Sequence, residues 1–437
     1  MPAAAAPDLP KAKAIGKLPG LETFTLGNGL QVAVLHSEAS PLASVQIWYH
    51  AGSKDESRTR RGTAHMFEHL MFQGSAHMRP DAFAQAIGSL GGYVSAATDE
   101  DATHFGSTLP VDRVDYAIRL EAERMRNLVF RKPVIDSVRA LIHDEIAQQA
   151  GSPFAQGLDR CLSVAYLKHP YAWTAIGNAH DLETLTIDEV KKFYDAYYQP
   201  NNAMLVVVGN VTAAAVKASA EKWFGPIAKA AEIPRPSQAA AEPAQTARRR
   251  EVVEAGQIGV TLIGWHIPPA KDKDAWPVQV ASLILGAGDS ARLKVRLKTP
   301  DAKTKQPVAL EAGTDALVRE DPGMAIALGA YVDPAKGDAV EAAIFDEVGK
   351  LASKGPSADE VRKAKNQLQS GLVFSLENVQ GMGEAIGRSW VLSGDPNAYL
   401  RDYDAIDKVT PADVQRVAKQ YFSPDQATVV VIPPRAR

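Results

Sequence analysis

The sequence contains little cysteine, no long apolar run and no excess of basic residues. Its 437 residues include one cysteine, Cys161, which excludes an internal disulfide framework and thiolate metal clusters and is expected to be a buried thiol. No stretch is apolar enough to span a membrane. The formal net charge is −3, and no basic stripe indicates nucleic-acid binding. The near-average apolar and charged fractions predict a soluble globular protein of two or more domains.

Residues 62–75 predict a short helix that is buried on most sides. Thr63 is a candidate cap at its beginning, and Gly74 is a candidate stop at its end. Apolar residues are spread around the axis of this helix, as expected for a helix inside the core. They are Met66, Phe67, Leu70, Met71 and Phe72.

The polar residues of this helix, His65, Glu68 and His69, share one face because side chains three and four positions apart meet on a helix. An unpaired polar face in an apolar helix is costly, so these groups need a partner. Zinc is such a partner, since it takes neutral imidazole and carboxylate ligands, and His-x-x-Glu-His is the inverse of the zincin order. The alternative is a core helix whose two histidines bond backbone or carboxylate groups.

A catalytic zinc needs a third protein ligand and one open position, and Glu145 is the best candidate for that ligand. Residues 136–149 predict a helix whose apolar stripe runs through positions 138, 141, 142, 145 and 146. A carboxylate on the core face must be paired, whereas His143 and Asp144 lie off the stripe and are more simply solvated. We therefore expect Glu145 to reach the metal.

Residues 61–75 resemble the zinc helix of the pitrilysin-like metallopeptidases, the inverzincin family that contains insulin-degrading enzyme and mitochondrial processing peptidase. In that family the third ligand is a glutamate 76 positions after the second histidine, which is the spacing from His69 to Glu145. The resemblance is to the small two-domain type, like the processing peptidase β subunit and its bacterial homologues. It implies one Zn²⁺ per chain held by His65, His69 and Glu145, with Glu68 as the general base.

Several further segments have clear patterns of secondary structure. The Asn28-Gly29 pair predicts a hairpin turn within residues 24–35. Residues 43–50 predict a second strand, 80–90 a helix, and 112–129 and 136–150 two more helices. A strand is expected to open at residue 91 and to continue through residue 106.

The family resemblance gives this last strand a role. In the family the matching strand is a sheet edge that pairs with the peptide to be cut. The resemblance therefore implies that Ser95, Ala96, Ala97 and Thr98 bind substrate. Ser95 stands where the family usually has asparagine.

A long internal repeat indicates two homologous halves. Residues 185–207 recur as 409–431 at a constant offset of 224, and each copy predicts helix, turn and strand. The expected fold class is α+β, with two homologous α/β-sandwich halves, each a mostly antiparallel sheet packed with helices. The expected domains are a disordered N-terminal segment (1–15), a zinc-binding catalytic domain (16–227), a linker (228–247) and a homologous non-catalytic domain (248–437).

Alignment of the two halves sets His65, Glu68 and His69 against Val278, Ala281 and Ser282. The second half is therefore expected to lack a metal and to serve as a wall, a hinge or a docking surface. Its Gly-x-Gly turn at 286–288 is a weak phosphate-loop pattern, and a structural turn is the better interpretation.

These patterns predict a zinc metalloendopeptidase that hydrolyses peptides or unfolded segments in a chamber formed with a second subunit. The alternatives are a non-catalytic, metal-bearing subunit that binds peptides or stabilises an assembly, and a zinc hydrolase acting on non-peptide amides. The intact Glu68 favours an enzyme, because a structural zinc site is closed by four ligands and needs no base.

The expected partner is a homologous, zinc-free subunit, with a homodimer as the second choice. Full-length pitrilysins have four homologous domains, and this chain has two. No oxyanion-stabilising Arg and Tyr of the family is recognisable in residues 250–437. The alanine-rich, proline-spaced start favours the bacterial periplasm over the cytoplasm.

Overall fold

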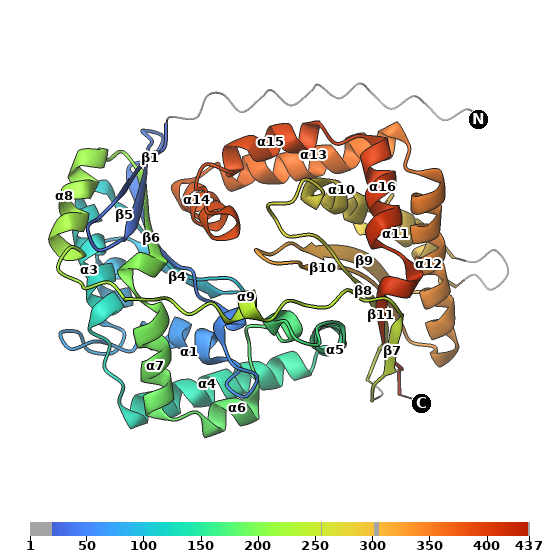
Figure 1. Cartoon of the computed structure of the whole chain (residues 1–437), viewed down its shortest axis with the longest axis horizontal. Helices are drawn as coiled ribbons and strands as arrows, with labels where there is room; N and C mark the ends of the chain where they lie inside the picture. The colour runs from blue at the N-terminus through green and yellow to red at the C-terminus, as the bar shows by residue number, and fades with distance from the viewer. Residues whose placement is uncertain (1–19, 255, 301–305, 436–437) are drawn as a thin grey trace.

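The computed structural model describes residues 20–254, 256–300 and 306–435, which form two sheets packed with helices (Figure 1). The first sheet has the spatial order β1-β2-β6-β3-β5-β4, and the second has the order β7-β11-β8-β10-β9. Only the pairs β2–β6 and β7–β11 are parallel. The described strands are β1 (Glu22–Thr25), β2 (Gln31–His36), β3 (Leu42–Tyr49), β4 (Tyr93–Thr98), β5 (Thr103–Pro110), β6 (Ala203–Gly209), β7 (Arg249–Val252), β8 (Gly259–His266), β9 (Glu311–Leu317), β10 (Met324–Tyr331) and β11 (Ala427–Ile432). The α+β expectation is confirmed.

The helices of the first half precede β7, and those of the second half follow β8. The first set is α1 (Thr63–Leu70), α2 (Ala82–Ser89), α3 (Val114–Arg126), α4 (Lys132–Ala150), α5 (Pro153–Ala165), α6 (Ala179–Thr184), α7 (Ile187–Tyr197), α8 (Ala213–Trp223) and α9 (Pro236–Ala239). The second set is α10 (Ala275–Gly286), α11 (Arg292–Lys298), α12 (Gly337–Lys354), α13 (Ala358–Ser375), α14 (Val379–Ser393), α15 (Tyr399–Asp407) and α16 (Pro411–Tyr421).

The internal repeat corresponds to one unit of the fold used twice. Helix α7 begins at residue 187 and α16 at 411, a separation of 224, and strands β6 and β11 begin at 203 and 427 with the same separation. Both helices start with a capping box, from Thr186 and Thr410. The helix, turn and strand predicted for each copy are therefore confirmed.

The Asn28-Gly29 turn is where the sequence predicted it. It joins β1 to β2 as an antiparallel hairpin, and Gly29 has a φ of +88°. The Asn28 side chain donates to the carbonyls of Phe224 and Ile227, so this turn also anchors the segment after α8.

The single strand expected from residue 91 to residue 106 is wrong, because the chain reverses in the middle of it. Strands β4 and β5 pair with each other as an antiparallel hairpin. Asp99 makes the turn, since its Oδ1 accepts the N–H groups of Asp101 (2.7 Å) and Ala102 (2.9 Å). The hairpin leaves β4 as the outer strand of the first sheet.

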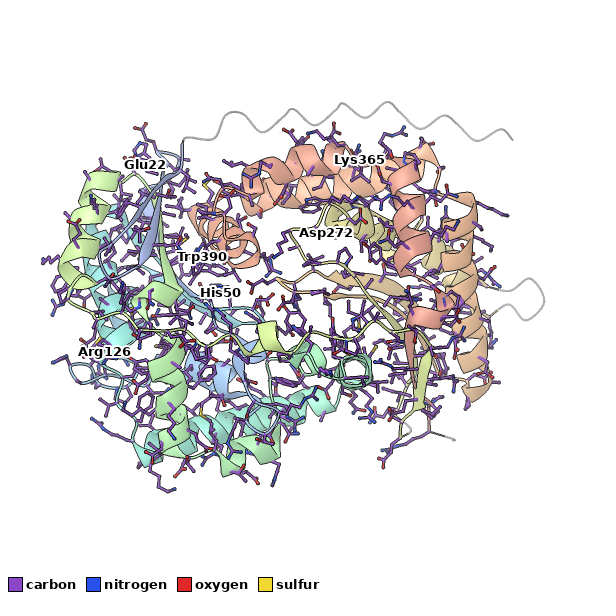
Figure 2. All side chains as sticks on the ribbon, viewed as in Figure 1. Glu22, His50, Arg126, Asp272, Lys365 and Trp390 are labelled. Carbon is purple, nitrogen blue, oxygen red and sulfur yellow. The ribbon has the colours of Figure 1, made fainter. Side chains whose placement is uncertain are left out.

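Each half covers one sheet face of the other half. Helix α5 packs on β8 and β11 of the second sheet, whereas α14 packs on β3 and β6 of the first sheet. Glycines permit the second contact, because a Cβ atom on Gly387 would lie 2.2 Å from the ring of Trp48. Figure 2 shows His50 and Trp390 where the halves meet, with ring centroids 5.9 Å apart. The two halves are interlocked.

The segment expected to be a linker, residues 228–247, makes defined contacts with both halves. Arg235 donates to the carbonyl of His50 (2.9 Å), and Gln245 donates to that of Ala427 (2.8 Å). The domain boundaries themselves stay a prediction, and the N-terminal segment 1–15 lies outside the described residues. Cys161 is buried and unpaired, as expected, and burial raises its thiol pKa to about 12. Among the described helices none is long and apolar enough to cross a bilayer.

Candidate metal centre and substrate edge

Helix α1 holds the predicted site residues in a fixed orientation because its apolar side chains are buried. Met66 and Phe67 are fully buried, and the Phe67 ring stacks on Tyr194 with centroids 5.9 Å apart. Burying a side chain of this size stabilises the fold by about 1.5–3 kcal/mol. The opposite face of α1 turns His65 and His69 toward α4 and β4.

The structure brings His65, His69 and Glu145 together. The Nε2 atoms of the two histidines are 3.3 Å apart. Glu145 Oε2 lies 3.5 Å from His65 Nε2 and 3.6 Å from His69 Nε2. No other group of three such residues within ligand distance of one another occurs among the described residues.

The donor set fits a tetrahedral zinc ion. Bonds of about 2.0–2.2 Å in tetrahedral geometry separate ligand atoms by about 3.3–3.6 Å, which matches the three observed separations. Burial, and then the neighbouring His69, lower the pKa of His65 to about 4, although Glu145 acts in the opposite direction. The imidazole is therefore neutral near pH 7, as a metal ligand must be. Three donors leave a fourth position open.

Within the described part of the chain, the second ring nitrogen of His65 has no partner of the usual kind. Metal-bound histidines usually donate their second ring N–H to a carboxylate or carbonyl. His65 Nδ1 is buried and finds no hydrogen-bond partner among the described residues. The orientation of His65 therefore depends on how its helix is held.

Helix α4 places Glu145 differently from the expected stripe. Val138 and Ile142 are buried, but Leu141 is 45% exposed, so the prediction that position 141 faces the core is wrong. Glu145 is partly buried, with a third of its side chain exposed. The neighbouring Asp144 is exposed, as expected.

Glu68 lies beside the cluster and is not part of it. It lines a cavity of about 730 Å³ together with His65 and the β4 residues Ala96, Ala97 and Thr98. We call this the metal-side cavity. Its far wall is formed by α4, α5 and the loop 174–179.

A second cavity, of about 780 Å³, lies on the other side of β4, toward α14. We call it the α14-side cavity. Ser95, Ala96 and Ala97 line it. Alternate residues of the strand face opposite sides, since the Tyr93 hydroxyl donates to Gln380 of α14 whereas Val94 packs into the core, but Ala96 and Ala97 border both cavities. The four predicted substrate residues therefore border two cavities on the free edge of the sheet.

A charge network that the sequence did not predict holds the β4–β5 turn, and it is mostly buried except for the Asp99–Arg388 pair. Three successive acids pair with cations from three other elements: Asp99 with Arg388 (3.2 Å), Glu100 with Arg319 (2.5 Å) and Asp101 with Lys54 (3.5 Å). The run of three acids at positions 99–101 was the sequence signal for this network, but the cations that pair with these acids lie far away in the sequence.

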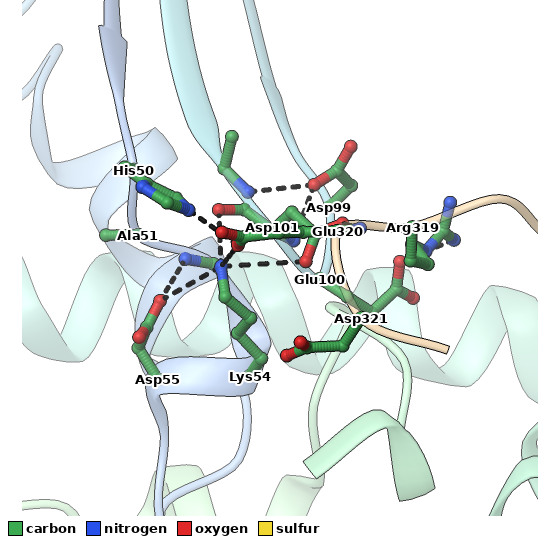
Figure 3. A network of polar contacts seen from close by, with 12 residues as sticks. His50, Ala51, Lys54, Asp55, Asp99, Glu100, Asp101, Arg319, Glu320 and Asp321 are labelled. Carbon is green, nitrogen blue, oxygen red and sulfur yellow. Dashed lines mark hydrogen bonds and ion pairs between the residues drawn. The ribbon is translucent and has the colours of Figure 1, made fainter. Parts of the chain in front are cut away.

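Lys54 is the centre of this network and is only 1% exposed (Figure 3). Its Nζ lies 3.3 Å from Glu320, which follows β9 in the second half, and it donates to the carbonyl of Asp101 (2.9 Å). Glu320 also accepts a hydrogen bond from His50 (2.6 Å). Burial opposes the charge of Lys54, but the surrounding carboxylates raise its pKa above the ordinary value. The second half thus contacts the turn beside the substrate edge.

The second half has no equivalent of the metal cluster among its described residues. Val278, Ala281 and Ser282 lie on α10 and are all buried in the second core. Helix α10 carries the positions that the alignment of the halves sets against His65, Glu68 and His69, and these positions hold small or apolar side chains.

Comparisons with known proteins agree with this architecture. The family model described as insulinase, peptidase family M16, matches residues 31–177, and the model described as the peptidase M16 inactive domain matches residues 184–368. The zinc protease PqqE of Helicobacter pylori is 28% identical over 423 residues, which cover 95% of this chain and 94% of that protein. The mitochondrial-processing peptidase subunit beta of Blastocladiella emersonii is 24% identical, with 96% and 90% covered.

A solved structure is also similar along nearly the whole chain. The crystal structure of a protease from Helicobacter pylori superimposes with a TM-score of 0.89 at 28% identity and covers 95% of this chain and all of that one. Both halves of the present chain and the junction between them are therefore shared with a solved relative. The chain belongs to the pitrilysin-like peptidase family M16 and is of its two-domain type.

Proposed function

We propose that this protein is a zinc-dependent endopeptidase that cleaves peptides bound along β4. The observation that carries the proposal is the convergence of His65, His69 and Glu145 near Glu68, with His65 and Glu68 lining a cavity along the outer strand β4. A relative along nearly the whole chain is named as a zinc protease, and a similar solved structure is named as a protease, which supports the same activity.

The metal would be held by the two histidines and Glu145, one ion per chain. A bound Zn²⁺ would supply Lewis-acid polarisation of the scissile carbonyl and activation of water. Glu68 is not needed as a ligand, so its carboxylate is free to take a proton from water and to pass it to the leaving amine. These two transfers are the general-base and general-acid steps of peptide hydrolysis.

The sheet edge accounts for a peptide substrate. The outer strand β4 offers backbone N–H and C=O groups to an extended chain, and such pairing reads the backbone while tolerating varied side chains. Side chains of an added strand would enter the metal-side cavity and the α14-side cavity alternately. Each of the two cavities is large enough for a large side chain.

The proposed active assembly is a chamber made with a second, homologous, zinc-free subunit, and a homodimer is the second choice. Among the described residues the cluster occurs in the first half alone, and it lies near the outer strand β4. The relative from Blastocladiella emersonii is named as a subunit, which supports an assembly of chains.

A peptide digest tests the proposed function. Purified protein is incubated with a panel of unstructured peptides, with and without a strong zinc chelator, and the fragments are read by mass spectrometry. We expect internal cleavage that chelator removes and added zinc restores. Internal cleavage that is unaffected by chelator would contradict a metallopeptidase, and binding without cleavage would favour the non-catalytic subunit.

A further inference from the structure

The first turn of α1 has no capping side chain of its own. Its N-cap is Gly62, with a φ of +91°, and the hydroxyl of Thr63 donates to the carbonyl of Arg60 (2.6 Å). The sequence-based expectation that Thr63 caps this helix is therefore wrong. The first N–H groups of a helix need acceptors from outside the helix when they are buried.

A buried carboxylate supplies these acceptors. Glu56 Oε1 accepts the N–H of Ala64 (2.7 Å), and its Oε2 accepts the N–H of Gly62 (3.0 Å). Glu56 is only 5% exposed. A negative charge at this end of the helix also interacts favourably with the helix dipole.

The same carboxylate binds the loop that walls the metal-side cavity. Trp173 Nε1 donates to Glu56 Oε2 (3.1 Å), and residues 174–179 directly after Trp173 line that cavity. The loop and the start of α1 touch through backbone, because a Cβ on Gly177 would lie 2.2 Å from the Cα of Gly62. Glu56 lies where the two segments meet.

We propose that Glu56 is a positioning residue for the metal centre: its carboxylate holds the first turn of α1 against the Trp173 loop and so fixes His65 in its place opposite His69 and Glu145. His65 lies one residue after Ala64, and its own Nδ1 finds no partner among the described residues. The backbone anchor therefore takes over the orienting task that an outer-shell acceptor usually performs. The consequence for metal binding rests on the proposed function.

The ionised form of Glu56 fits this geometry, because all three contacts are N–H donors. These donors lower the pKa of Glu56, but burial outweighs them and raises it to about 8, so the ionised form dominates only above about that pH. A glutamine has the same shape but only one acceptor oxygen, so its NH₂ group would face at least one N–H. The substitution E56Q thus breaks part of the anchor without changing its size.

The test measures the zinc dissociation constant of the whole chain by competition with a chelator, and the hydrogen exchange of residues 62–70 without metal. In E56Q we expect zinc binding to weaken by about tenfold or more and exchange in these residues to rise. The matched control is E360Q, because Glu360 is also a helix-capping carboxylate, accepting the N–H of Ser357 at the start of α13. E360Q should leave both quantities unchanged.

A milder variant keeps the test decisive if E56Q fails to fold. W173F removes one of the three donors, and we expect smaller changes in the same directions. Wild-type zinc affinity and exchange in folded E56Q, or in W173F if E56Q does not fold, would overturn the proposal. A wild-type chain that bound no zinc would overturn the proposed function, and the exchange measurement alone would then decide the role of Glu56.

Discussion

At the scale of single residues, His65, His69 and Glu145 form one set of possible metal donors. They meet because the buried apolar side chains of α1 and α4 fix the orientation of both helices. Helix spacing brings His65 and His69 within 3.3 Å of each other, but the third donor comes from a separate helix and depends on how α4 packs against α1. Two histidines alone would need no metal, because one Nε2–H could donate a hydrogen bond to the other Nε2. The carboxylate at 3.5 Å and 3.6 Å makes a cation the better partner.

The role of Glu145 can be separated from that of its neighbour. We expect Glu145→Ala to weaken zinc binding by more than about tenfold, since one of three donors is lost, and Asp144→Ala to leave it unchanged. The measurement is zinc content at limiting metal, with thermal unfolding to show that both variants fold. Normal zinc content in Glu145→Ala would assign the third ligand to another carboxylate.

At the scale of elements, the account depends on the outer strand β4. A peptide that adds to a sheet edge forms hydrogen bonds with the edge through every second residue. N-methylation of a substrate should therefore weaken its binding at every second position. We expect methylation at alternate positions to raise KM about tenfold, since each removes a hydrogen bond worth about 1 kcal/mol and adds a steric clash. The positions between them should change KM little.

The check is a set of single N-methylated versions of one cleaved peptide, with steady-state kinetics for each. The unmethylated peptide and one methylated outside the bound segment serve as controls. A uniform effect along the peptide, or none, would show that substrates do not bind as an added strand.

The sequence predicted elements well where local pattern decides them. The Asn28-Gly29 hairpin and the repeated helix, turn and strand are in place because turn chemistry and periodicity are local properties. The turn at Asp99 was missed although its hydrogen bonds are local, whereas the charge network around it was missed because its cations come from positions 54, 319 and 388, which no local pattern connects. The exposure of Leu141 was missed because packing between helices, and not hydropathy, decides which face of α4 is covered.

The same distinction applies to the site. The His-x-x-Glu-His spacing was visible in the sequence, but Glu56 was not, because its function is defined by backbone groups that have no sequence identity of their own. Helix α1 ends at Leu70, before the expected stop at Gly74. The chain leaves the helix early because it turns toward Ser75 through Gly74, which has a positive φ.

At the scale of the whole molecule, the two halves are held together by exchanged helices and by buried charges. Helix α14 covers the first sheet and α5 covers the second, so neither half buries its own sheet completely. The second half also contacts the β4–β5 turn through Arg319 and Glu320. The second half is therefore part of the structure that holds the turn at the end of the outer strand β4.

Acid should weaken this junction in a defined range. Burial acts to raise the pKa of Glu320, but the hydrogen bond from His50 and the charge of Lys54 outweigh it and lower the pKa to about 2. Because the folded-state pKa lies below the ordinary value of 4.5, the contribution of Glu320 to stability is complete above about pH 4.5 and is lost as the pH falls toward 2.

The variant Glu320→Gln isolates this contribution. We expect it to be less stable than wild type by about 1–3 kcal/mol at pH 7, and the difference to shrink below pH 4.5. Denaturant unfolding at a series of pH values measures it, with Glu38→Gln, an exposed glutamate, as the control. A stability difference that is constant from pH 7 to pH 3 would contradict the assigned ionisation.

The assembly makes a separate prediction about activity. We expect the purified chain at nanomolar concentration to cleave peptides poorly and to gain activity when a homologous zinc-free chain is added. Mass in solution is measured on the same samples. Full activity from a species with the mass of one chain would refute the chamber, and full activity from a homodimer would refute only the second, different subunit.

The substitution Glu68→Gln separates catalysis from metal binding, because it removes the proposed base and keeps all three proposed metal donors. Zinc content and peptide hydrolysis are measured on the same preparation, with wild type beside it. The account predicts about one zinc per chain in both proteins and loss of hydrolysis by at least about a hundredfold in the variant. Comparable turnover in a zinc-loaded Glu68→Gln chain would contradict it.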